Sequence, residues 1–101
     1  MKKLNEAIVC SDGFKISVQA RAESYCTPRD DVGPYTHVEC GYPSEEEPLL
    51  MPYAEDPSVP TDTVYGWVPR SVVTLVIAKH GGVLSGQLPN GVPYLKAKSE
   101  F

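Results

Sequence analysis

Three cysteines and two histidines are the residues of this chain best suited to metal binding or nucleophilic catalysis. A zinc site would use Cys26, His37 and Cys40 as ligands, with Cys10 or His80 as the fourth. The spacing of the first three is C-x10-H-x2-C. This pattern lacks the closely spaced pair of thiols that structural zinc sites use. An odd number of cysteines also fits free thiols in a reducing compartment better than a disulfide framework. We therefore predict buried thiols, no metal and no cofactor.

Carboxylates and imidazoles leave a small-ligand or hydrolytic site open as an alternative hypothesis. A thiol or a carboxylate beside an imidazole can carry nucleophilic or acid–base chemistry if the fold brings the groups together. His80 also has a simpler interpretation, because the dipole at the C-terminal end of a helix stabilises a charged imidazole there. The residues of this alternative site are Cys26, Asp31, His37, Glu39 and His80.

The middle of the chain is strongly acidic. The whole chain has 9 Lys and Arg against 13 Asp and Glu, for a net charge of −4. Residues 22–62, here called the acidic segment, contain ten of the acids and a single base, Arg29, for a local charge of −9. This charge argues against direct binding to nucleic acid. Clustered negative charge speeds association with a basic surface, so we predict a binding protein that docks on a basic protein partner.

Tyrosines are interleaved with these acids. Tyr combines a large apolar area with a polar tip and is enriched at interfaces, although these rings can also pack on the prolines of their own loops. We predict that the acids steer association and that the tyrosines anchor the partner. The predicted binding residues are Glu45, Glu46, Glu47, Glu55, Asp56, Tyr42 and Tyr53.

The elements that position these residues are short strands, one helix and long loops, within a single domain of 101 residues. Apolar and polar residues alternate over 14–21, residues 7–10 are apolar throughout, and between the two stretches lies Asp12-Gly13, a strong hairpin turn signal. Pro69 and Gly81 are typical of the two ends of a helix. The predicted elements are a β-hairpin at 5–21, strands at 35–40 and 63–68, a helix at 69–80, and a tail at 81–101 that is frayed from residue 96.

The predicted fold class is α+β. An antiparallel sheet of about four strands packs on the C-terminal helix through a stripe of Val72, Val73, Val76 and Ile77. The acidic segment, rich in Pro and Tyr, lies over an edge or an end of the sheet. The tail can add a short edge strand around Val83. No apolar run approaches the ~18 residues that a membrane span requires, and no export signal follows the N-terminal lysines.

Four stretches resemble a family of small proteins of tailed bacteriophages: GPYTHVECGYPS at 33–44, PYAEDP at 52–57, VYGWVP at 64–69 and KHGG at 79–82. The resemblance covers roughly residues 5–89. No activity is assigned to that family, so no catalytic residue carries over. The resemblance implies a protein in the cytoplasm of an infected bacterium, where such proteins often inhibit host enzymes or defence systems. A virion or structural accessory protein that assembles through an exposed sheet edge is a further alternative.

Overall fold

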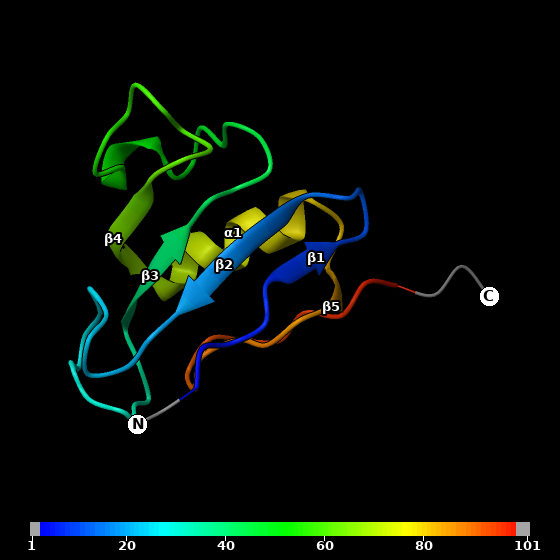
Figure 1. Cartoon of the computed structure of the whole chain (residues 1–101). Coiled ribbons are helices and arrows are strands. Elements are labelled where there is room, and N and C mark those ends of the chain that lie inside the picture. The colour runs from blue at the N-terminus through cyan, green and yellow to red at the C-terminus, as the bar shows by residue number, and fades with distance from the viewer. Residues whose placement is uncertain (1–2, 99–101) are drawn as a thin grey trace.

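The computed structural model describes residues 3–98, which form one antiparallel sheet and a helix packed against it (Figure 1). The strands are β1 (Ile8–Cys10), β2 (Lys15–Gln19), β3 (His37–Gly41), β4 (Val64–Pro69) and β5 (Val83–Ser85). Their order in the sheet is β4-β3-β2-β1-β5. The helices are α1 (Arg70–Lys79) and the 3-10 helix η1 (Met51–Tyr53). The predicted α+β class is confirmed, with five strands in place of about four.

The predicted hairpin is formed by β1 and β2. Ile8 pairs with Ile16 across it. Within the turn, the Asp12 carboxylate accepts a hydrogen bond from the backbone N–H of Phe14 at 2.9 Å. Gly13 has φ +94°, a conformation that costs glycine little. The turn therefore fixes the register that places the apolar side of both strands in the core.

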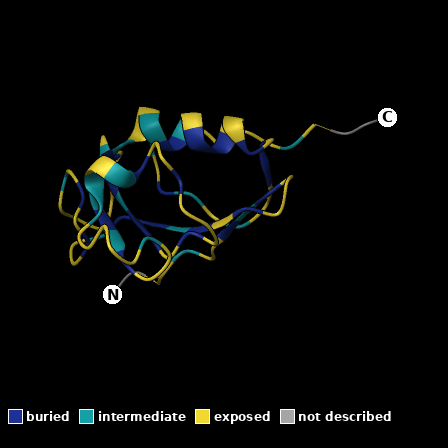
Figure 2. Cartoon of the chain, turned by 90° about the horizontal axis from the view of Figure 1, so that it is seen from above, coloured by how far each residue is buried: buried dark blue, intermediate teal, exposed yellow. Residues whose placement is uncertain are grey.

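The core lies between the sheet and α1, which covers one face of the sheet (Figure 2). The helix buries Val73, Val76 and Ile77, and Val72 is half-buried. Full burial of a side chain of this kind contributes about 1.5–3 kcal/mol. The strand residues of the core are Ile8, Cys10, Ile16, Val18, Val38, Cys40, Tyr65, Val68 and Val83.

The edge strand β4 contains a bulge. Its pairing with β3 shifts register between Tyr65 and Val68, so that Gly66 and Trp67 together lie opposite Glu39. The extra residue lets Tyr65 and Val68 both point into the core although they are three positions apart. Trp67 has φ +49°, which is rare for a bulky residue. The bulge thus breaks the simple alternation of a regular strand.

The acidic segment is folded onto the sheet. Leu50 is fully buried, and η1 follows it directly. The Glu55 backbone N–H donates to the Val64 carbonyl at 2.9 Å, and Ala54 forms an isolated bridge with Tyr65. These two contacts cover part of the outer edge of β4, as predicted for a segment lying over a sheet edge.

The tail returns along β5. The Val83 N–H donates to the Leu95 carbonyl at 2.7 Å, and the Ala97 N–H donates to the Val83 carbonyl at 3.0 Å. The prediction of fraying from residue 96 is therefore wrong for Lys96 and Ala97, because β5 supplies backbone partners; residues 99–101 lie outside the described part. Both outer strands are partly covered, which leaves little unpaired edge for assembly. Within residues 3–98, none of the helices has the length and apolar composition that crossing a bilayer requires.

Candidate functional site

The fold separates the two histidines of the predicted Cys/His/carboxylate site. His37 pairs with Pro69, which directly precedes α1, whereas His80 follows the last residue of α1. At 1.5 Å of rise per residue, the length of α1 puts the two histidines about 15 Å apart. They cannot share one catalytic centre.

The other members of that predicted site hold local structure. The Cys26 sulfur lies 3.3 and 3.4 Å from two backbone carbonyl oxygens, to either of which its single S–H can donate. The Asp31 carboxylate accepts a backbone N–H at 2.8 Å, and the Glu39 carboxylate accepts the Tyr25 N–H at 3.0 Å. The His37 ring contacts the hydroxyl of its neighbour in sequence at 2.9 Å. Across residues 3–98, no three His, Cys, Asp or Glu side chains are gathered to hold a metal ion.

The thiols are unsuited to nucleophilic chemistry at neutral pH. Burial raises the pKa of the Cys40 thiol to about 12. Burial also raises the pKa of Cys10 and of Cys26. Because the thiolate is the reactive form, these three side chains behave as small buried apolar groups.

His80 instead lies at the centre of a buried polar network. Its Nδ1 is 2.6 Å from Asp12 Oδ2, and its Nε2 is 2.8 Å from Glu47 Oε1. Lys79 Nζ lies 2.8 Å from the same Glu47 oxygen. The imidazole also stacks on Phe14, with ring centroids 4.0 Å apart and an interplanar angle of 11°. One network thus joins the hairpin turn, the acidic segment and the end of α1.

This geometry requires a charged imidazole. Both ring nitrogens face carboxylates, and only an imidazolium can donate from both. Burial lowers the pKa of His80, but the hydrogen bonds to Asp12 and Glu47 outweigh it and leave the pKa above its ordinary value. Burial likewise raises the pKa of Glu47, but the hydrogen bonds from Lys79, from a backbone N–H and from His80 leave it lowered.

Glu47 is therefore a structural residue, not a steering residue. Only 1% of its surface is exposed, so it cannot meet a partner, contrary to its place in the predicted binding set. Its partner His80 lies 33 positions away, and no local pattern in the sequence links the two. The other acids of the predicted binding set, Glu45, Glu46, Glu55 and Asp56, are exposed, as is Tyr42, whereas Tyr53 is half-buried.

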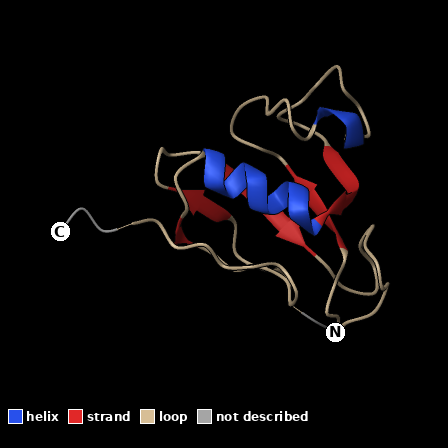
Figure 3. Ribbon diagram, turned by 180° about the vertical axis from the view of Figure 1, so that it is seen from behind, coloured by secondary structure: helices blue, strands red, loops and turns tan. Residues whose placement is uncertain are grey.

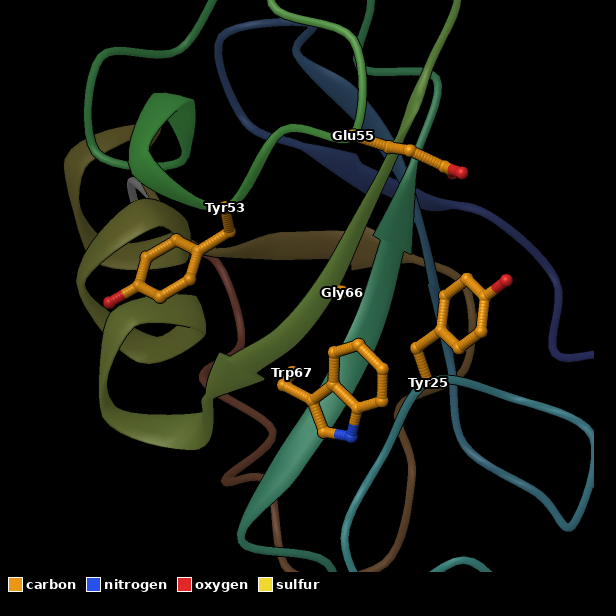
Figure 4. A pocket seen from close by; sticks show the side chains of 5 residues that line it. All are labelled: Tyr25, Tyr53, Glu55, Gly66 and Trp67. Atoms are coloured by element: carbon orange, nitrogen blue, oxygen red, sulfur yellow. The ribbon is translucent and has the colours of Figure 1, made fainter.

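A hollow of about 340 Å³ opens beside β4. It is lined by Tyr25, Tyr53, Glu55, Gly66 and Trp67 (Figure 4). Two residues of the predicted binding set, Tyr53 and Glu55, are thus brought together with two aromatic residues that the prediction did not include. A glycine within a strand pattern often marks a bulge or a close approach of a ligand, and Gly66 was the available signal.

Trp67 and Tyr25 form the aromatic wall of the hollow. Their rings stack with centroids 5.0 Å apart at an angle of 27°, and the backbone N–H of Trp67 donates to the Tyr25 carbonyl at 3.0 Å. Nevertheless, 49% of Trp67 and 37% of Tyr25 remain exposed. Figure 4 shows Glu55 pointing to the same side of β4 as Tyr25, while the Tyr53 ring is turned away from the stacked pair.

The aromatic pair lies on the face of the sheet away from α1. Val38 and Cys40 point into the core, so Glu39 between them points outward, and its carboxylate holds the Tyr25 N–H. In Figure 3, which shows the molecule from behind, α1 lies in front of the strands. The helix therefore covers the face of the sheet opposite to Glu39. The hollow and the helix are therefore on different sides of the sheet.

Comparison with known proteins gives no match: no family model, curated protein or solved structure matches the chain. The resemblance to phage proteins therefore stays a prediction. What the fold and the site define is an α+β domain with a buried ionic network and an exposed aromatic hollow.

Proposed function

We propose that this chain is a protein-binding module that docks its acidic, aromatic face on a basic surface of another protein. The observation that carries the proposal is the half-exposed Trp67, stacked on Tyr25 at the hollow beside Glu55. Trp and Tyr are the residues most often found as energetic anchors at the centre of protein interfaces. Here the two are adjacent, exposed and held in one orientation.

The backbone at Trp67 supports a role outside the fold itself. A left-handed conformation costs a non-glycine residue about 1–2 kcal/mol. At this position the side chain gains only a partial stack, because half of it stays in water. Strain of this kind is concentrated at binding and catalytic sites, where the surrounding structure maintains it.

The exposed acids of the acidic segment supply the electrostatic part of the proposed docking. Glu45, Glu46 and Asp56 lie at the surface and are available to attract a basic partner over a distance. Such charges mainly increase the association rate, and salt screens them. The aromatic pair then supplies the contact area. The phage resemblance favours a host protein as the partner, with inhibition as the outcome when docking covers the partner's own site.

The test is an affinity capture from bacterial lysate with matched variants as bait. The wild-type chain is compared with Trp67→Ala, with Glu45→Lys/Glu46→Lys, and with Leu75→Ala, an exposed substitution on α1 across the sheet. The proposal predicts a stoichiometric partner that high salt releases and that the first two variants fail to retain. Retention of the same proteins by all four baits would contradict it.

A further inference from the structure

The hollow at Trp67 has the composition of a site for a flat cation. Its walls are the faces of Trp67 and Tyr25, and a carboxylate, that of Glu55, lies at its rim. Aromatic faces carry negative potential and attract cations within about 6 Å. The carboxylate gives no advantage to an apolar ligand, and the acids of this segment repel an anion.

Within the molecule, a guanidinium already lies over one of these rings. The Cζ atom of Arg29 lies 5.7 Å from the centroid of the Tyr25 ring. Arg29 is the single base of the acidic segment, so the remaining charges of this region are negative. Trp67 offers a second aromatic face that is half-exposed.

We propose that this hollow binds an arginine side chain presented by the partner protein. This inference rests on the proposed function, since it names the group that the aromatic, acidic face would recognise. A guanidinium is planar, stacks on aromatic rings and pairs with a carboxylate through two parallel hydrogen bonds. An ammonium is a compact, strongly hydrated charge without these features, so arginine is preferred over lysine.

The position of each group supports this assignment. Gly66 lies in the lining between the aromatic pair and Glu55, and a Cβ at this position would be in ordinary contact with Tyr25, 3.4 Å from the Tyr25 Cβ. Backbone pairing with β4 fixes Glu55 through the hydrogen bond to Val64. The backbone segments that carry Glu55 and Tyr25 thus both hydrogen-bond to the same strand.

The first experiment uses three blocked tripeptides as probes: acetyl-Gly-Arg-Gly-amide and its lysine and citrulline counterparts. Citrulline has nearly the shape of arginine but no charge. Trp67 is the chain's single tryptophan, so its indole N–H signal in NMR spectra and its fluorescence report on this site alone. We expect a saturable shift with the arginine peptide and about three- to thirtyfold weaker binding of the citrulline peptide.

Two variants make the test specific. Glu55→Gln is expected to weaken binding of the arginine peptide about two- to fivefold, the range for an exposed ion pair. Asp62→Asn removes an exposed acid of the same segment that does not line the hollow, and it should leave the affinity unchanged. Equal binding of the arginine and citrulline peptides, or equal effects of the two variants, would overturn the inference.

A competition experiment separates this inference from the proposed function. If a partner is captured through Trp67 and the arginine peptide displaces it, both proposals are supported. If capture depends on Trp67 but the peptide neither binds nor competes, the arginine inference is overturned and the binding function stands. If capture does not depend on Trp67, the proposed function fails, whatever the peptide does.

Discussion

Replacing Glu47 by Gln is the sharpest perturbation of the folded state that the structure offers. The substitution keeps the shape of the side chain and removes the buried negative charge. Glu47 Oε1 accepts from His80 Nε2 and from Lys79 Nζ, both at 2.8 Å, and Oε2 accepts from the Leu49 N–H at 2.7 Å. The amide would leave two cations facing each other without the carboxylate between them.

The expected loss of stability is large. A hydrogen bond to a charged group contributes about 1.5–3 kcal/mol, and breaking a buried ion pair from one side costs about 3–5 kcal/mol. Because Lys79 is half-exposed and can turn to water, we expect a loss near the lower limit, about 3 kcal/mol. For a domain of this size, that corresponds to a fall in Tm of about 12–24 °C.

The pH dependence gives the prediction a second signature. The contribution of Glu47 is fully present above its ordinary pKa of 4.5 and is lost as pH falls through its lowered folded pKa. The contribution of His80 is fully present below its ordinary pKa of 6.5 and is lost as pH rises through its raised folded pKa. The difference between wild type and Glu47→Gln should therefore be largest between about pH 4.5 and 6.5.

Urea unfolding at pH 5.5 and pH 8.5, followed by circular dichroism, measures this difference. The matched control is Glu46→Gln, an exposed neighbour whose effect should stay within about 0.5 kcal/mol. If Glu47→Gln is as mild as the control, the buried network does not stabilise the fold and the reasoning is refuted. A difference that grows towards pH 8.5 would contradict the assignment of a charged His80.

Further predictions concern the backbone, the thiols and the bulge. Gly91→Ala should cost about 2–3 kcal/mol, because φ is +101° and a Cβ would lie 2.8 Å from the Tyr35 carbonyl oxygen. Gly13→Ala, with φ +94° and no atom within 4 Å of its Cβ, should cost about 1 kcal/mol in the same urea assay; equal losses would count against the steric argument. An aromatic disulfide reagent at pH 8 should label no thiol in the folded protein and three in denaturant, measured by absorbance; rapid labelling before unfolding would show an accessible thiolate. Trp67→Gly should change stability by less than about 1 kcal/mol, because relief of strain offsets the lost stacking on Tyr25; a loss above about 2.5 kcal/mol would make Trp67 a structural residue.

Local signals in the sequence were sufficient for the main elements. The Asp12-Gly13 turn predicted the hairpin, and the apolar stripe from Val73 to Ile77 predicted the buried face of α1. These patterns depend on neighbours within one or two turns of chain, so a single sequence contains them. The fifth strand, β5, was foreseen only as an option because three residues carry little periodicity.

Long-range relations could not be read in the same way. The pairing of Glu47 with His80 depends on how the acidic segment folds back on α1, and a run of three glutamates gives no sign of which one is buried. The hollow depends on the bulge at Gly66, which turns Trp67 outward. There the Trp67 ring stacks on Tyr25, which belongs to a loop far away in the sequence. Charge and composition indicated exposed acids, but not the stacked aromatic pair.

Site-specific photo-crosslinking tests the central claim most directly. A benzoylphenylalanine is placed at position 67 in one variant and at position 75, on the exposed side of α1, in a control. Both are irradiated in bacterial cells, and the adducts are separated by mass. We expect one discrete protein adduct from position 67 and none from position 75. The adduct from position 67 should not form when Glu45 and Glu46 are also replaced by lysine. The same adducts from both positions, or an adduct from position 75 alone, would contradict the central claim.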